Sequence, residues 1–190
     1  MYTYKFDIHK MELVKDCNLH PTEVSQSDTS WLYARNNKYT DECVNPKKVG
    51  KWMLFLSQNS VNVIWDKIKA AVANGDLWSS KVSTTNSEKS SYAIMVYTKD
   101  YTDKSDVIHV LNYLETSGIK PPRVTIKYKT DEQTRAGIYS GSRQKPWIYS
   151  SDTIRGGAAQ RSDSLFWRDT KAANQPSCSG SDVHTKHSYK

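Results

Sequence analysis

The middle of the chain contains a short apolar, aromatic-rich run, Gly50-Lys51-Trp52-Met53-Leu54-Phe55-Leu56, which predicts a β-strand. Polar residues follow at 57–60, and their side chains are of the kinds that cap helix N-termini. Apolar residues then recur at helical spacing, at Val61, Ile64, Trp65, Ile68, Ala71 and Val72. They form one stripe on a helix that we expect to end at Asn74-Gly75, since glycine commonly closes helices. This strand and helix form the centre of the predicted domain.

Two more strands and a second helix are expected after this centre. The strands cover 78–84 and 92–98, with a polar turn between them. Capping residues at 100–105 then begin an amphipathic helix, which Gly118 closes. The apolar stripe of this helix comprises Val107, Ile108, Leu111 and Leu114. The alternation of strands and helices therefore continues through the middle of the chain.

The last part of the domain is predicted to be a strand and a hairpin. Pro121-Pro122 cannot continue a helix and lead into a strand over 124–129. Its alternation places Val124, Ile126 and Tyr128 on one face and Thr125, Lys127 and Lys129 on the other. A hairpin-like pair is a candidate at 137–139 and 147–149. Together the elements predict an α+β fold: a curved sheet with helices packed on one face.

The flanking regions are less regular than the middle. We expect residues 1–30 to be an amino-terminal extension, 31–150 the domain, and 151–190 a mostly disordered tail rich in small polar residues. Inside the tail, Leu165-Phe166-Trp167 is an isolated apolar trio. No internal repeat is visible.

Composition excludes several classes of protein. A mean hydropathy of −0.73 and the lack of a long apolar run exclude a transmembrane helix, and the amino terminus has no apolar signal segment. The three cysteines, Cys17, Cys43 and Cys178, are widely spaced and predict free thiols rather than disulfides or a metal site. We expect the protein in the cytoplasm, with the nucleus left open, and without a cofactor.

The formal net charge is +7. The excess of basic residues concentrates in residues 120–145. The acidic residues of this stretch are Asp131 and Glu132, and its basic residues are Lys120, Arg123, Lys127, Lys129, Arg135, Arg143 and Lys145. A basic folded surface is typical of proteins that bind phosphate-bearing partners. An ordinary solvated surface has a similar composition, so both interpretations stay open.

The order of these pieces resembles the translation initiation factor 4E fold, which implies a curved antiparallel sheet with helices packed on its convex face. The shared features are Gly50-Lys51-Trp52, a helix with the interior Trp65, the strand 92–98 and the run Pro121-Pro122-Arg123-Val124. The chain looks closer still to the basophilic-leukaemia-expressed protein family, which has a domain of unknown function. That likeness rests on Val96-Tyr97-Thr98-Lys99-Asp100 and on the run over 128–140. The resemblance covers about residues 31–150.

The resemblance implies a binding protein. In the cap-binding family two tryptophans sandwich a methylated guanine, a glutamate hydrogen-bonds its edge, and basic side chains hold the phosphates. The matching stretch here, Thr40-Asp41-Glu42-Cys43-Val44, has an acidic pair and no tryptophan. Trp31 is then a candidate for one stacking ring, and Tyr33 or Tyr39 for another. The cap-type preference for methylated guanine is expected to be absent.

The candidate site combines exposed aromatic rings with basic side chains. Its members are Trp31, Tyr33, Lys127, Lys129, Arg135, Arg143 and Lys145, and Lys47, Lys48 and Lys51 would extend it. Trp52, Trp65 and Tyr92 lie within apolar patterns and are expected in the core, and packing is also favoured for Trp78. The sequence thus predicts a non-catalytic domain that binds RNA or a nucleotide on a basic face.

Two other classes of function are alternatives to this one. A protein–protein adaptor would use the helical face, as 4E-type domains also bind partner helices there. An enzyme is not expected, because the chain contains no nucleophile-elbow, phosphate-loop or metalloprotease motif. The position of the basic residues separates the first two: the nucleic-acid interpretation needs them beside exposed aromatics on the face without the core helices.

Overall fold

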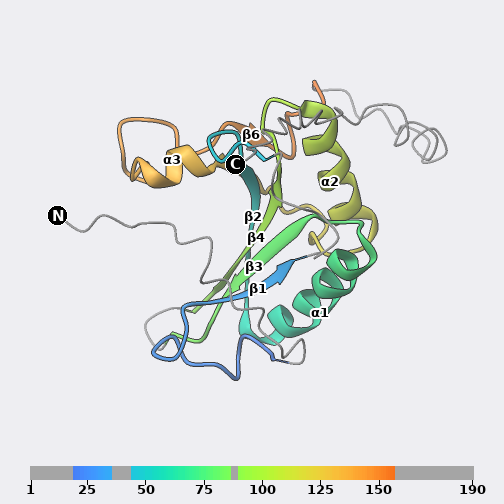
Figure 1. Cartoon of the computed structure of the whole chain (residues 1–190), viewed down its shortest axis with the longest axis vertical. Helices are drawn as coiled ribbons and strands as arrows, with labels where there is room; N and C mark the ends of the chain where they lie inside the picture. Colours follow the sequence, from blue (N-terminus) through green and yellow to red (C-terminus); the bar gives the residue numbers. More distant parts are fainter. Residues whose placement is uncertain (1–18, 36–43, 87–89, 157–190) are drawn as a thin grey trace, which may run out of the picture. The chain divides into compact units, whose positions relative to one another are not determined.

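The computed structural model describes residues 19–35, 44–86 and 90–156 (Figure 1). The three cysteines, Tyr39, the acidic pair at 41–42 and the apolar trio at 165–167 lie outside the described residues. The elements are, in chain order, β1 (Trp31–Arg35), β2 (Gly50–Leu56), α1 (Gln58–Asn74), β3 (Ser79–Ser83), β4 (Tyr92–Thr98), α2 (Lys104–Thr116), β5 (Lys127–Thr130), α3 (Asp131–Arg135) and β6 (Tyr149–Ser150).

The six strands form one antiparallel sheet with the order β1-β3-β4-β2-β5-β6. Helices α1 and α2 lie on one side of this sheet and the short α3 lies on the other (Figure 1). The predicted α+β class, an antiparallel sheet with helices packed on one face, is confirmed. Because side chains alternate along each strand, every strand directs side chains to both sides of the sheet. We call the side covered by α1 and α2 the helix face.

The core of the domain lies on the helix face. Trp52 is completely buried there, and its indole Nε1 donates a hydrogen bond to the Val107 carbonyl of α2 at 3.0 Å. Trp65 on α1 is also buried, and so is Tyr92 on β4. The prediction that these three aromatic residues pack in the core is confirmed. Helix α1 ends where expected, with Gly75 in the left-handed conformation at φ 86°.

Gly50 is required because another ring passes directly over it. A Cβ atom at this position would collide with the phenol of Tyr128 on the neighbouring strand β5. The Tyr128 ring also packs edge-on against Trp52, with centroids 5.3 Å apart, and its hydroxyl hydrogen-bonds Thr98 Oγ1 at 2.5 Å. Burial raises the pKa of this phenol. The Gly-Lys-Trp sequence therefore joins β2 to both of its neighbouring strands, β4 and β5.

The segment after α2 differs from the prediction. The strand expected over 124–129 begins only at Lys127, and Val124 is 47% exposed. The reason is local: a turn links Val124 N to the Pro121 carbonyl, and Arg123 adopts a positive φ of 61°. Ile126 and Tyr128 do face the core as expected.

The prediction of a hairpin at 137–139 and 147–149 was also wrong in part. Thr130 forms a capping box with Gln133 and begins helix α3 directly after β5. Ile138 then bonds back to the Gln133 carbonyl, so 137–139 forms no strand. Of the second half only Tyr149 becomes part of a strand, pairing with Tyr128.

Described residues on both sides of 31–150 contact the domain. Leu19 and Val24 pack against the core at one end, and Ile154 packs against it at the other. Arg155 donates hydrogen bonds to Asn112 and Glu115 of α2, at 2.6 and 2.9 Å. The limits 31–150 stay a prediction. No helix within the described ranges combines the length and the apolar character that crossing a membrane requires.

Candidate functional site

Strand pairing arranges side chains in two rows across the sheet, on the side opposite the helix face. The first row contains Arg35, Ser79, Tyr97, Lys51 and Lys129. The second row contains Tyr33, Lys81, Met95, Met53 and Lys127. Directly paired side chains lie about 5 Å apart at their Cβ atoms. We call this side the lysine face, after Lys51, Lys81, Lys127 and Lys129.

Three of these lysines are partly desolvated, and one carboxylate, Asp131, acts on two of them. Burial lowers the pKa of Lys51, Lys81 and Lys129, and the charge on Lys51 lowers the pKa values of the other two further. Asp131 forms an ion pair with Lys51, and its charge also acts on Lys81 in the opposite direction to burial. The centre of the lysine face therefore carries an excess of positive charge in partly desolvated surroundings.

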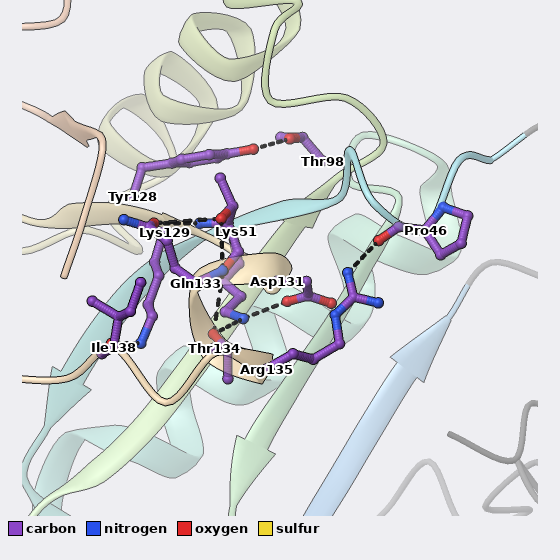
Figure 2. Close-up of polar contacts among 11 residues, drawn as sticks. Pro46, Lys51, Thr98, Tyr128, Lys129, Asp131, Gln133, Thr134, Arg135 and Ile138 are labelled. Atoms are coloured by element: carbon purple, nitrogen blue, oxygen red, sulfur yellow. Dashed lines mark hydrogen bonds and ion pairs between the residues drawn. The ribbon is translucent and has the colours of Figure 1, made fainter. Parts of the chain in front are cut away.

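Helix α3 and the loop after it cover one half of the lysine face (Figure 2). Lys51 Nζ donates to Asp131 and to Thr134 Oγ1, the latter at 2.7 Å. Lys129 Nζ donates to the Ile138 carbonyl at 2.5 Å. Arg135, at the end of α3, donates a hydrogen bond to the carbonyl of Pro46, in the turn before β2, at 2.8 Å. Lys51 and Lys129 are consequently 5% and 4% exposed.

Aromatic rings accompany the lysines of this covered half. Trp147 has two ammonium groups over its ring, Lys127 at 4.2 Å and Lys145 at 3.5 Å from the centroid. Lys129 lies 4.0 Å from the centroid of Tyr139. Lys127 also donates to Ser150 Oγ at 2.7 Å. These lysines have internal partners, which include cation–π contacts.

The half formed by β1 and β3 is different. Lys81 Nζ lies 4.2 Å from the centroid of the Trp31 ring, and within the described segments no carboxylate pairs with it. Tyr33 stands beside Lys81 in the strand register and is 44% exposed. Phe55 on β2 is 64% exposed. With Arg35 on β1 and the adjoining Phe55 of β2 included, this side of the lysine face presents two cations and three aromatic side chains among the described residues.

The structure brings only some of the predicted site residues together. Trp31 and Tyr33 lie on β1, whereas Lys127 and Lys129 lie on β5, and three strands separate them. Four strand spacings amount to roughly 19 Å. Arg135 and Lys145 belong to the covering segment, and Arg143 lines a shallow hollow on it with Gly137 and Gln144.

Of the proposed extension residues, only Lys51 lies within the lysine face. Lys48 instead pairs with Asp100 at 2.9 Å, and Lys47 is exposed in the turn before β2. Trp78 is half-buried, as favoured for packing.

Sequence reasoning missed Lys81 and Tyr97. Both sit between inward-facing residues of predicted strands: Lys81 precedes the buried Val82, and Tyr97 lies between Val96 and Thr98. The alternation in 78–84 and 92–98 was therefore the available signal. The alternation does not reveal the strand order, which places β3 next to β1 and β4 next to β2.

Comparisons with known proteins give one family match and several similar solved structures. Residues 47–136 match the family model of the basophilic leukemia-expressed protein Bles03. A solved structure of schistosome eIF4E complexed with m7GpppA and 4E-BP is 14% identical, over 63% of this chain and 69% of that chain, with a TM-score of 0.49. C. elegans eIF4E-3 with the 4E-binding protein Mextli and a cap analog is 17% identical, over 62% and 66%, with a TM-score of 0.46.

The caps and binding proteins in those structures are ligands of the neighbours. A third similar structure, Ascaris suum eIF4E-3 with an m7G cap, is 15% identical over 62% of this chain and 66% of that chain, with a TM-score of 0.42. The resemblance to the Bles03 family that the sequence motifs indicated is thus confirmed over residues 47–136, which match its family model.

Proposed function

We propose that the lysine face is a non-catalytic binding surface for a nucleotide or single-stranded RNA, acting in the cytoplasm. The observation that carries this proposal is that Lys51, Lys81 and Lys129 lie on one face of the sheet, where one carboxylate, Asp131, acts on Lys51 and Lys81. Phosphate groups would give Lys81 the direct ion-pair partner that the described residues do not supply.

Lys81 is the side chain that a phosphate would stabilise most. Its ammonium group is partly desolvated, and burial lowers its pKa. An anion within contact distance favours the charged form of a lysine and offsets the cost of desolvation. Lys51 and Lys129 already donate to internal oxygens, so they contribute positive potential rather than free donors.

The aromatic side chains support a nucleic-acid ligand over a simple anion. Trp31 and Tyr33 flank Lys81 on the neighbouring strand. Base stacking on an aromatic side chain contributes about 1–3 kcal/mol per base, and it tolerates any sequence because every base has a π-face. A lysine between the exposed Tyr33 ring and the half-buried Trp31 ring therefore suits a phosphate with a base on either side.

An adaptor function on the helix face is less well supported. Of the large hydrophobic side chains that are exposed in the described segments, Val63 is the one on a helix of that face. Its neighbours on α1 are charged and internally paired: Asp66 with His20 and Lys69, and Lys67 with the Ser117 carbonyl. Tyr33 and Phe55, by contrast, point from the lysine face.

The test is the salt dependence of RNA binding. A short single-stranded RNA should bind more weakly as salt rises, with a log–log slope of about −0.7 per phosphate contact. Lys81→Gln should weaken binding and flatten the slope by about 0.7. Lys67→Gln makes the same charge change on α1 and should leave the slope as in the wild type. Absence of salt-dependent binding at low ionic strength would contradict the proposal and favour the adaptor.

A further inference from the structure

A hollow of about 270 Å³ opens at the end of the lysine face where β3 and β4 join. Its aromatic walls are Trp31 on β1 and Phe55 on β2, and residues 83–84 and 91–93 lie between them. Phe55 is the more exposed of the two at 64%, although it belongs to a central strand. Packing within the described chain does not account for this exposed ring.

The polar groups of the hollow are neutral. They are hydroxyls and amides, contributed by Gln26, Ser30, Ser83, Thr84, Asn86, Ser91 and Tyr92. Some of them are already used: Ser83 Oγ accepts from Ala93 N at 2.9 Å, and Thr84 Oγ1 donates to the Thr29 carbonyl. None of the described lining residues carries a carboxylate. Such a lining suits a flat, uncharged ring with hydrogen-bonding edges.

The hollow and the lysine cluster share one residue. Trp31 lines the hollow, and its ring also lies 4.2 Å from Lys81 Nζ. Lys81 pairs in register with Tyr33, two residues along β1 from Trp31. Two residues of strand cover about 7 Å, so a ring in the hollow and an anion at Lys81 are within the reach of one small molecule.

We propose that this hollow receives the uncharged base of a nucleotide, stacked on Phe55 or Trp31, while the phosphate of the same nucleotide contacts Lys81. This inference rests on the proposed function of the lysine face and adds to it the position and the charge of the base. The positive charge of Lys81 next to Trp31 disfavours a cationic ring, and no described lining carboxylate compensates for it.

The experiment separates the base from the phosphate. Dissociation constants of 5′-AMP, adenosine and ribose 5-phosphate are measured by calorimetry at low salt, for the wild type, Phe55→Ala and Phe55→Tyr. Phe55→Ala should weaken AMP binding about tenfold and leave ribose 5-phosphate unchanged. Phe55→Tyr keeps a stacking ring and should restore AMP binding to within about threefold. Because Phe55 is 64% exposed, neither variant is expected to unfold the domain.

A matched control removes an exposed ring elsewhere. Tyr139 is 57% exposed on the loop after α3, outside the hollow, and Tyr139→Ala should bind AMP as the wild type does. If AMP binds no better than ribose 5-phosphate and Phe55→Ala has no effect, the hollow is not the base site, while the phosphate-binding face stands. If neither phosphate compound binds and RNA does not bind either, both proposals fail together.

Discussion

The two halves of the lysine face are built from the same sheet and from the same kinds of residue, yet they differ in what satisfies their charges. On the β2–β5 half, α3 supplies Asp131 and Thr134 to Lys51, and the following loop supplies the Ile138 carbonyl to Lys129. On the β1–β3 half, Lys81 has an aromatic face as its neighbour. A buried ammonium group that has oxygen partners becomes costly when one of them is removed, whereas an ammonium group without them has donors left for a ligand.

The largest effect expected from this difference is on stability. Asp131→Ala leaves the Lys51 ammonium buried without its carboxylate, and removing one partner of a buried pair costs about 3–5 kcal/mol. Since Asp131 is itself 23% exposed, we expect the lower end, about 3 kcal/mol. Urea denaturation monitored by tryptophan fluorescence measures the loss. Lys48→Gln breaks an exposed pair with Asp100 and should cost less than about 1 kcal/mol.

Replacing Lys81 should change the free energy of unfolding in the opposite direction to Asp131→Ala, or not at all. Lys81→Gln removes a partly desolvated charge that has no described carboxylate partner, so the free energy of unfolding should stay the same or rise by up to about 1 kcal/mol. The same denaturation experiment measures it. A loss of more than about 1 kcal/mol would show that Lys81 is a structural lysine like Lys51, and the distinction between the two halves would not hold.

The third comparison is between the affinities for methylated and unmethylated guanine nucleotides. A methylated guanine carries positive charge, which strengthens stacking by a cation–π contribution. Near Lys81 this gain meets repulsion, so 7-methyl-GMP should bind no more than about tenfold, or ~1.4 kcal/mol, better than GMP. Tryptophan quenching with the two nucleotides tests this. A much larger preference would place the base away from Lys81, at aromatic rings other than those of the β1–β3 half.

The smallest effect is expected at an exposed pair outside the lysine face. Hydrogen bonding to Asp66, 3.1 Å from His20 Nε2, raises the pKa of His20 above 6.5. The resulting stabilisation is complete below the unfolded-state pKa and is lost as pH rises through the folded-state pKa. Unfolding free energy should therefore fall slightly between about pH 6 and 8, and less so in His20→Gln. Equal pH dependence in both proteins would contradict the assignment.

Much of the fold was predictable because its signals are local. The stripe from Val61 to Val72 determines one face of α1, and Gly75 ends the helix by a conformation that other residues rarely adopt. The strand 92–98 was predicted with its observed limits for the same reason, as a run of apolar residues bounded by polar turns. Where local signals competed, the prediction was wrong: the turn at Arg123 delays β5, and the capping box at Thr130 begins helix α3, which the sequence analysis did not predict.

The candidate site was predictable only in part, because it depends on which strands become neighbours. Alternation alone gives Lys127 and Lys129 a shared face, and the structure agrees. Neither Lys81 nor Phe55 belonged to a predicted site, since nothing in their own segments shows that Trp31 lies beside them.

The amino-acid sequence by itself determined the elements, their caps and the side of the sheet on which each strand residue lies, since these follow from contacts over a few residues. Only the tertiary structure decided which lysines are paired. Lys51 and Asp131 are 80 residues apart in the chain and meet because β5 pairs with β2 and α3 folds back over them. Lys81 meets Trp31 instead, because β3 pairs with β1 at the opposite edge. Charges on a sheet are satisfied by whatever the long-range packing brings to them, which no local pattern specifies.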